Sequence, residues 1–198
     1  MENNLVPHEN ISSNKIIFYG DSYVGKTSFI KTYISSKESI ETEAVTIGLN
    51  ISSKNIMHKG EKIKIQLWDV TGGKRFADIL TNYCNDIIGA MILFDVSDIV
   101  SFNNISLWYT TIKKVSPNCP IVICGYKIDG IRKIPYKDCV NISKELGCVY
   151  TEATSTSVPS VNNAIECLLS QIRFDLKNKD NITIRVNSIK KDTSGIKN

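Results

Sequence analysis

The feature that most constrains this chain is a short run near its start, Gly20-Asp21-Ser22-Tyr23-Val24-Gly25-Lys26-Thr27. An apolar, β-rich run precedes it at residues 15–19, and a run that suits a helix follows from Ser28 to Ile34. The two glycines permit a tight loop whose backbone N–H groups point inward, and the helix adds the positive end of its dipole. The spacing G-x-x-x-x-G-K-T in this context predicts a phosphate-binding loop, with Lys26 on the β- and γ-phosphates and the Thr27 hydroxyl on Mg²⁺.

Composition sets the class of protein and its boundaries. The chain has 198 residues, of which 42% are apolar and 22% charged, as expected for one soluble globular domain. We expect a disordered lead at residues 1–14, the domain at 15–176 and a basic, flexible tail at 177–198. The basic residues of the tail account for the net charge of +4, so the domain is close to neutral and nucleic acid is not an expected partner. No apolar run is long enough to span a membrane. The six cysteines lack a C-x-x-C pair, which favours a reducing, cytoplasmic location.

Apolar β runs alternate with helical patterns along the chain. This alternation predicts an α/β fold, a doubly wound and mostly parallel sheet of six strands with one antiparallel strand and helices on both faces. The expected strands are residues 15–19, 47–58, 62–69, 87–96, 120–125 and 148–150, with 47–58 and 62–69 paired as an antiparallel hairpin. The expected helices are residues 28–34, 101–115, 136–146 and 160–176. Residues 35–45 are polar and aperiodic, which indicates a loop, and residues 72–85 form no regular pattern.

Further motifs fall in loops next to strand ends, where open α/β sheets bind ligands. They are Val45-Thr46-Ile47-Gly48, Trp68-Asp69-Val70-Thr71-Gly72 and Phe94-Asp95-Val96-Ser97-Asp98. Together with the phosphate-binding loop and the order of elements, these motifs resemble the Ras superfamily of small GTPases, and the Rab family most closely, over residues 15–174. The resemblance implies a P-loop NTPase with the small G-protein fold, GTP or GDP as the ligand, and Mg²⁺.

In that family, a threonine and a D-x-x-G motif surround the γ-phosphate. The resemblance implies that Thr46 closes on Mg²⁺ and the γ-phosphate, that Asp69 holds Mg²⁺ through water, and that Gly72 offers its backbone N–H to the γ-phosphate. The loops around Thr46 and Gly72 are then two switches that order around GTP and present their surfaces to protein effectors and an exchange factor. The expected effector region is Glu43, Ala44, Val45, Thr46, Ile47 and Gly48.

The family's base-recognition pattern N/T-K-x-D appears as Tyr126-Lys127-Ile128-Asp129. Asp129 can accept from the guanine N1–H and exocyclic amine, a contact that adenine cannot return, and the Lys127 stem can lie along the base. The second base loop is Thr154-Ser155-Thr156, where the Ser155 N–H can meet guanine O6. The nucleotide-binding set is thus Gly20, Asp21, Ser22, Tyr23, Val24, Gly25, Lys26, Thr27, Ser28, Asp69, Gly72, Tyr126, Lys127, Asp129, Ser155 and Thr156. The catalytic set is Lys26, Thr46, Gly72 and Gly73.

The sequence also departs from the family pattern. Gly73 stands where the family's glutamine orients the attacking water, and glycine has no side chain for that task. Tyr126 replaces the asparagine that ties the base to the phosphate loop, and Thr156 replaces the lysine of S-A-K. No aromatic residue occurs between Tyr33 and Trp68, so the ring that covers guanine from the first switch is missing. We therefore expect weakened nucleotide binding and slow hydrolysis.

Three functions remain open at this point. The first is a monomeric Rab-like GTP switch that hydrolyses slowly and engages effectors of vesicle traffic. The second is a Rab mimic that binds effectors or regulators without turnover. The third, another P-loop enzyme such as a kinase, is disfavoured because a switch threonine, D-x-x-G and K-x-D have no reason to coexist there. The last cysteine is Cys167, so no prenyl anchor is expected by this route, and the basic tail offers at most a weak contact with an anionic membrane.

Overall fold

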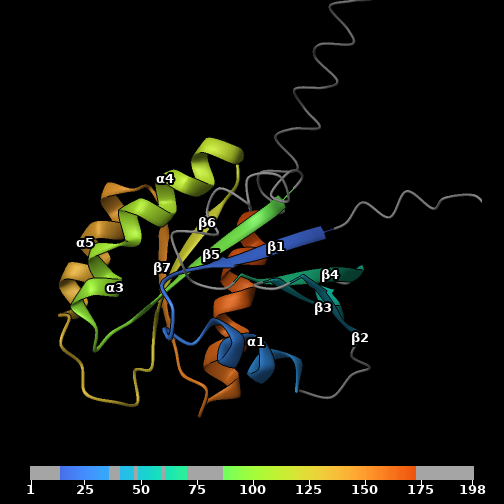
Figure 1. The fold of residues 1–198 in the computed structure, drawn as a ribbon, viewed down its shortest axis with the longest axis horizontal. Coiled ribbons are helices and arrows are strands. Elements are labelled where there is room, and N and C mark those ends of the chain that lie inside the picture. The colour runs from blue at the N-terminus through green and yellow to red at the C-terminus, as the bar shows by residue number, and fades with distance from the viewer. Residues whose placement is uncertain (1–13, 36–40, 47–48, 59–60, 71–86, 173–198) are drawn as a thin grey trace, which may run out of the picture.

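The computed structural model describes residues 14–35, 41–46, 49–58, 61–70 and 87–172. Several expectations lie outside these ranges, namely most of the lead, the tail, the segment 72–85, and the site residues Ile47, Gly48, Gly72 and Gly73. In the described part, strands and helices alternate to build a single sheet with helices on both faces (Figure 1). The α/β fold class expected from the sequence is confirmed.

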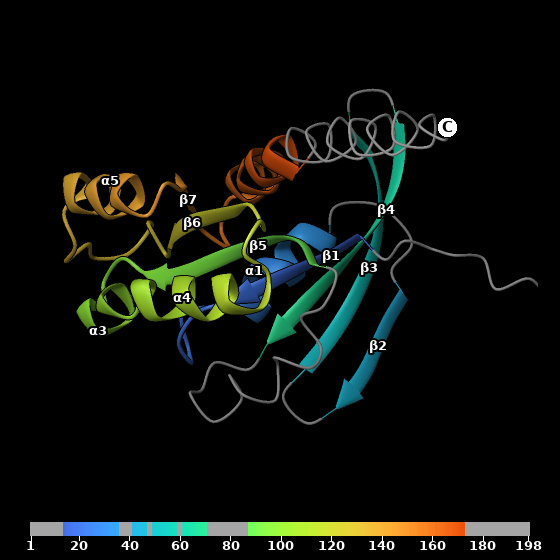
Figure 2. The ribbon, with the colours of Figure 1, turned by 90° about the horizontal axis from the view of Figure 1, so that it is seen from above.

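Seven strands of the described chain form the sheet, in the order β2-β3-β4-β1-β5-β6-β7. Their bounds are β1 Asn14–Tyr19, β2 Glu41–Thr46, β3 Leu49–His58, β4 Glu61–Val70, β5 Ile87–Asp95, β6 Ile121–Tyr126 and β7 Val149–Ala153. Within this sheet β3 alone runs in the direction opposite to the other strands, and its antiparallel pairing with β4 confirms the expected hairpin (Figure 2). Because parallel strands end at a common edge, the loops after β1, β4, β6 and β7 gather there.

The strand β2 occupies a segment for which the sequence had indicated a loop, so that prediction is wrong and the sheet has one strand more than expected. Residues 41–46 pair antiparallel with β3, from Glu41 opposite Ser53 to Thr46 opposite Leu49. β2 lies at the edge of the sheet, where a strand needs hydrogen bonds on one side only and charged residues are common. The strand therefore lacks the apolar alternation on which the sequence prediction depended.

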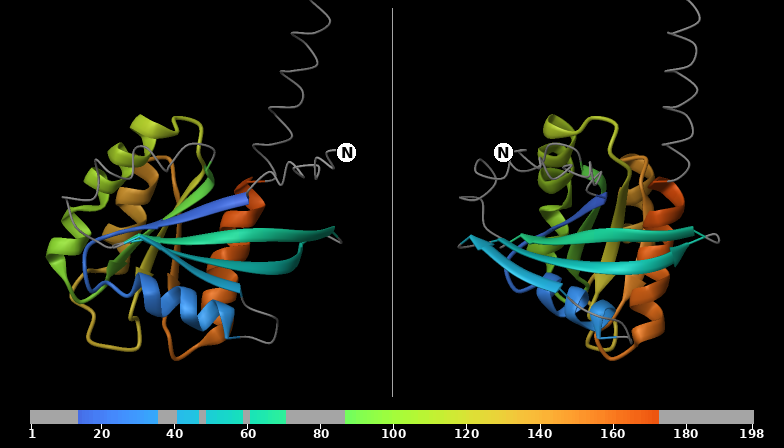
Figure 3. Two further views of the ribbon diagram at one scale, coloured as in Figure 1. Left: turned by 45° about the vertical axis from the view of Figure 1, so that its right-hand side comes forward. Right: turned by 90° about the vertical axis from the view of Figure 1, so that its right-hand side faces the viewer.

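The helices cover the two faces of the sheet. Their bounds are α1 Lys26–Ile34, α3 Ile99–Asn103, α4 Ile105–Val115 and α5 Tyr136–Glu145, followed by a C-terminal helix described over residues 158–172. Helix α1 and the C-terminal helix pack on one face, and α3, α4 and α5 pack on the other (Figure 3). Each face buries its own apolar cluster, with β1 and β5 between the two. The strand that leads into the phosphate-binding loop is therefore held in the middle of the core.

Asn104 interrupts the helix that was expected over residues 101–115. Asp98 caps α3, because its carboxylate accepts a hydrogen bond from the Val100 backbone N–H at 3.0 Å. Helix α3 then ends before Asn104, and α4 begins after it with Trp108 and Ile112 on the buried side, as the spacing predicted. None of the helices in the described ranges is long and apolar enough to cross a membrane.

Candidate nucleotide-binding site

The loop between β1 and α1 has the geometry of an anion site. Gly20 and Gly25 have φ angles of 142° and 105°, in the left-handed region that favours glycine. No side chain of the described residues caps the N-terminus of α1, and the first turn of this helix, which starts at Lys26, contains no acidic residue. The backbone N–H groups and the positive dipole end therefore face the loop without a capping side chain, which favours an anionic ligand.

Lys26 crosses this loop from the first position of α1. Its ammonium donates to the Gly20 carbonyl at 2.9 Å and to the Asp21 carbonyl at 2.7 Å, and the residue is only 6% exposed. Burial lowers the pKa of Lys26 to about 8, although Asp69 and Asp21 offset part of that effect. A buried cation held by neutral carbonyls gains much from a phosphate, so Lys26 occupies the position that a phosphate-binding role requires.

Because the pKa of Lys26 is low, stability and nucleotide affinity should change in opposite directions as the pH rises. Above pH 8 the unfolded chain keeps a proton that the folded, ligand-free protein has released, until the ordinary lysine pKa of 10.5 is reached. Stability should therefore rise with pH over this interval, by up to about 3 kcal/mol. Nucleotide affinity should fall over the same interval, approaching about tenfold per pH unit, because phosphate binding needs the charged lysine. Urea unfolding and nucleotide titration at several pH values measure both trends.

Lys26→Met is the control for this prediction, because methionine has a similar length and does not titrate. Both pH trends should flatten in the variant relative to the unmodified protein. Trends of unchanged slope in Lys26→Met would show that another group carries them.

Thr27 and Asp69 meet between the start of α1 and the end of β4. The Thr27 hydroxyl donates to an Asp69 carboxylate oxygen at 2.5 Å, and Asp69 is buried. Two hard oxygen ligands side by side, next to Lys26, suit Mg²⁺, which binds through one or two protein oxygens and keeps several waters. These residues therefore fit the ion that the resemblance implied. Within the described ranges, no group of three or more His, Cys, Asp or Glu could hold a metal ion.

The loop, the start of α1, the start of β3 and the end of β4 border a cavity of about 420 Å³. The residues that line it are Ser22, Tyr23, Gly25, Lys26, Thr27, Ser28, Asn50, Asp69 and Val70. All of them except Asn50 and Val70 belong to the nucleotide-binding set expected from the sequence. Asn50 enters the site because the register of the hairpin places it opposite Asp69. A polar residue on a strand forms no motif, so no sequence pattern marked Asn50 as a site residue.

Asp21 is anchored by two residues that carried no site motif. The Asn104 amide donates to one carboxylate oxygen at 2.6 Å, and the Trp108 indole N–H donates to the other at 2.7 Å. Trp108 also packs on Tyr19, with ring centroids 5.9 Å apart. The Asp21 side chain thus ties the phosphate-binding loop to the break between α3 and α4, while its backbone carbonyl accepts from Lys26. The helical spacing predicted a core position for Trp108 but not this hydrogen bond.

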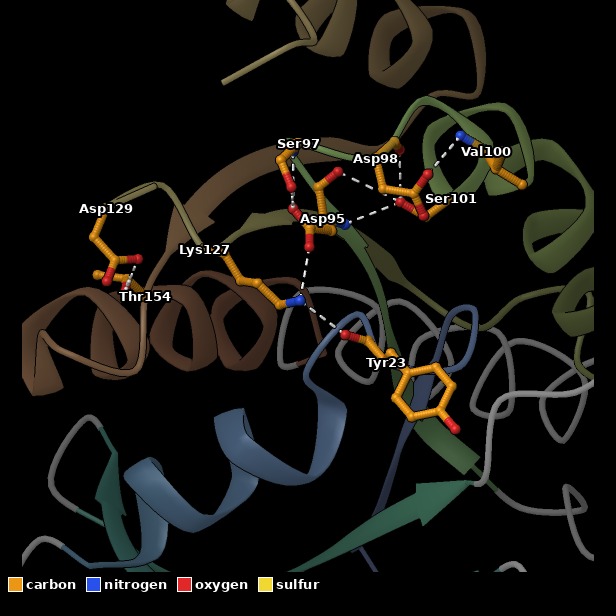
Figure 4. Close-up of polar contacts among 9 residues, drawn as sticks. All are labelled: Tyr23, Asp95, Ser97, Asp98, Val100, Ser101, Lys127, Asp129 and Thr154. Atoms are coloured by element: carbon orange, nitrogen blue, oxygen red, sulfur yellow. Dashed lines mark hydrogen bonds and ion pairs between the residues drawn. The ribbon is translucent and has the colours of Figure 1, made fainter. Parts of the chain in front are cut away.

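Lys127 joins the first base loop to the phosphate-binding loop (Figure 4). Its ammonium donates to the Tyr23 carbonyl at 2.9 Å and forms an ion pair with Asp95 at 2.7 Å. Asp95 also accepts from the Ser97 backbone N–H at 2.8 Å and the Ser97 hydroxyl at 2.6 Å. Burial alone would raise the pKa of Asp95, but the hydrogen bonds from Lys127 and Ser97 hold it below its ordinary value. Lys127, which follows β6, therefore fixes the phosphate-binding loop and the end of β5 to the end of β6.

Asp129 lies exposed beyond Lys127, and the second base loop holds its carboxylate. The Thr154 hydroxyl donates to one oxygen at 2.5 Å (Figure 4), and the Thr156 hydroxyl donates to the other at 3.2 Å. These hydrogen bonds, led by the one from Thr154, hold the pKa of Asp129 below its ordinary value. Thr156, at the position of the family's lysine, therefore supports Asp129 directly. Ser155 is exposed between the two threonines.

Tyr126 is buried beneath the phosphate-binding loop, with 1% of its surface exposed. Its ring fills the space beside Gly25, where an added Cβ would lie 2.5 Å from the Tyr126 Cε1, and packs against Phe29 with centroids 5.7 Å apart. Burial raises the pKa of Tyr126. Within the described residues the Tyr126 Oη has no hydrogen-bond partner. The ring thus links β6 to the loop by packing, where the family uses an asparagine.

The structure brings only part of the expected site together. Val24 is buried in the core, so its backbone alone can face a ligand. Thr46 is the last residue of β2, and Glu43, Ala44 and Val45 precede it on that edge strand. Of the expected catalytic residues, the described part of the chain contains Lys26 and Thr46, and it places Thr46 at the end of β2.

The fold and the site define an α/β protein of the P-loop class, with an uncapped helix, a buried lysine and a Thr–Asp pair at one edge of a parallel sheet. Residues 15–174 match the sequence profile of the Ras family. The chain is 31% identical over 165 residues to the Ras-related protein RABC2b of Arabidopsis thaliana, which covers 81% of this chain and 80% of that protein. It is 32% identical over 170 residues to the Ras-related protein Rab-13 of Canis lupus familiaris, which covers 80% and 79%.

A third relative, the GTP-binding protein ypt2 of Schizosaccharomyces pombe, is 30% identical over 163 residues, with 80% of each chain covered. The chain therefore belongs to the Ras family, and it is a Rab-like small GTPase of that family. The family expected from the motifs is confirmed.

Proposed function

We propose that this protein is a Rab-like molecular switch that binds GTP and GDP with Mg²⁺, hydrolyses GTP slowly and acts in intracellular vesicle traffic. The observation that carries the proposal is the pair of contacts made by Lys127. Its ammonium binds the Tyr23 carbonyl and Asp95, and these contacts hold the base loop against the phosphate-binding loop. A ligand that occupies both loops has a base at one end and phosphates at the other. The similarity to a protein named as GTP-binding supports guanine as that base.

Guanine is also the base that the chemistry of Asp129 favours. An ionised carboxylate accepts from two donors on one edge of guanine, whereas the corresponding edge of adenine offers an acceptor. Titration of the nucleotide-free protein with GDP and ADP, and mass spectrometry of the nucleotide that copurifies, test this assignment. We expect guanine nucleotide in the purified protein and much tighter binding of GDP. Equal affinities for GDP and ADP would refute it.

The chain's own groups bind and orient the substrate in this mechanism. The N–H groups of the loop and the Lys26 ammonium hold the β- and γ-phosphates and stabilise the charge that develops on them. Thr27 and Asp69 would hold Mg²⁺, which supplies further positive charge to the phosphate oxygens when bound. The remaining task is to aim the attacking water, and the residue at the family's position for it is Gly73.

Gly73→Gln should accelerate single-turnover GTP hydrolysis about tenfold, because glutamine restores a side chain that can orient the water. The matched control is Gly73→Ala, which restricts the backbone in a similar way but adds no carboxamide, and which should leave the rate unchanged. Phosphate release from protein preloaded with GTP measures both variants. Brisk hydrolysis by the unmodified protein, with no gain in Gly73→Gln, would show that another group positions the water.

The same glycine favours a second function, a Rab mimic that binds effectors or regulators without turnover. Lys26, Thr27 and Asp69 support triphosphate binding in either case. Prolonged incubation of the GTP-loaded protein distinguishes the two functions, since any conversion to GDP supports the switch and persistent GTP supports the mimic. Both functions use residues 43–48 and the second switch as the surface for effectors and an exchange factor.

The free cysteines of the described chain support a reducing, cytoplasmic compartment, where we expect a monomer.

A further inference from the structure

Tyr23 has a backbone conformation that is rare for its residue type. Among the described residues other than glycine, only Tyr23 and Lys127 have positive φ, at 66° and 63°. The left-handed conformation strains any residue with a bulky side chain, and such strain is often retained where it serves a function. Lys127 is held in place by its contacts with Asp95 and the Tyr23 carbonyl. Those contacts also hold the Tyr23 backbone, but they do not involve its ring.

The Tyr23 ring gains nothing from the protein core. The residue is 94% exposed, and in Figure 4 the ring extends away from Lys127 and from Asp129. An exposed aromatic in a strained loop lowers stability without a compensating contact in the folded protein. Any benefit of tyrosine at this position must therefore arise in a bound state, in which a ligand or partner covers the ring.

The position of Tyr23 in the loop indicates which ligand could cover its ring. Tyr23 lines the cavity together with Lys26, Thr27 and Asp69, the residues suited to phosphate and Mg²⁺. Rotation about its side-chain torsions can bring an unpacked tyrosine over the mouth of this cavity. The segment between Tyr33 and Trp68 contains no aromatic residue that could cover the cavity from the opposite side. A tyrosine suits this task, because its hydroxyl can donate to an anionic oxygen while its ring excludes water.

We propose that Tyr23 is a lid on the phosphate end of the bound nucleotide, with its hydroxyl donating a hydrogen bond to a phosphate oxygen and its ring shielding the phosphates from solvent. This inference rests on the proposed function, because it takes a guanine nucleotide as the ligand. The lid is supplied by the phosphate-binding loop itself and slows nucleotide release.

Tyr23→Phe tests the lid with the smallest change, since it keeps the ring and the backbone strain and removes only the hydroxyl. Release of fluorescent GDP from preloaded protein, chased with unlabelled GDP, should be about 10-fold faster in Tyr23→Phe. Tyr23→Asn, which tolerates the left-handed backbone, should release GDP at least as fast as Tyr23→Phe. The melting temperature of the nucleotide-free protein should not fall in either variant, because the side chain is exposed.

Met57→Asn is the control for changing an exposed apolar residue, since Met57 is 65% exposed near the far end of the β3–β4 hairpin. Its release rate should equal that of the unmodified protein. Release from Tyr23→Phe that is as slow as from the unmodified protein would overturn the lid and leave the proposed function intact. If the unmodified protein fails to retain labelled GDP, that result would overturn the proposed function, and the lid with it.

Discussion

Gly20→Ala is expected to lower the free energy of unfolding by about 3–5 kcal/mol. Gly20 has a φ of 142°, and an added Cβ would run into the backbone carbonyl of Leu93 on β5. Strand β5 is in the middle of the sheet and its backbone cannot move aside without disturbing both neighbours. Urea unfolding of the nucleotide-free variant measures the loss. Nucleotide affinity should fall as well, because the Gly20 carbonyl is one acceptor of the Lys26 ammonium.

Gly147→Ala is the matched control for backbone strain without a clash. Gly147 has a φ of 65°, and apart from its two chain neighbours no described residue comes within 4 Å of the position that its Cβ would take. This variant should lose only about 1 kcal/mol and keep its nucleotide affinity. Similar losses in the two variants would mean that strain alone, and not the contact with β5, makes glycine necessary at position 20.

Asp129→Ala is expected to weaken GDP binding about 100-fold and to leave ADP binding unchanged. The structure supports this expectation because hydrogen bonds from Thr154 and Thr156 fix the carboxylate in the ionised form that accepts from guanine. Titration of the nucleotide-free protein with each nucleotide measures the change. The aromatic ring, asparagine and lysine that assist in the family are absent here, so the guanine preference depends heavily on Asp129.

Two further variants sharpen this test. Thr154→Val removes the 2.5 Å hydrogen bond that positions Asp129 and should cause a smaller loss of GDP affinity in the same direction. Asp138→Ala removes an exposed carboxylate on α5, away from the base loops, and should have no effect on either nucleotide. A loss of GDP affinity in Asp138→Ala equal to that in Asp129→Ala would point to net charge rather than to base recognition.

The elements of this fold that follow from local sequence were predictable. The phosphate-binding loop, the β3–β4 hairpin and the buried strand β5 depend on glycine spacing, alternation and apolar runs, all of which act over a few neighbouring residues. The edge strand β2 was not predictable in this way, because pairing with β3 creates it and its own pattern resembles a loop. The break at Asn104 was missed for a related reason, since helical periodicity continues across it.

The sequence by itself determined which chemical groups stand at the proposed nucleotide site, since Lys26, Thr27, Asp69, Lys127 and Asp129 all lie in motifs. Only the tertiary structure decided how these groups are held. Asn104 and Trp108 reach Asp21 from more than eighty residues away, and the ring of Tyr126 fills the space that Gly25 leaves open. Such contacts depend on the order of strands and on which helices share a face of the sheet. No local pattern of residues encodes them, because they form only when separate elements meet in the folded core.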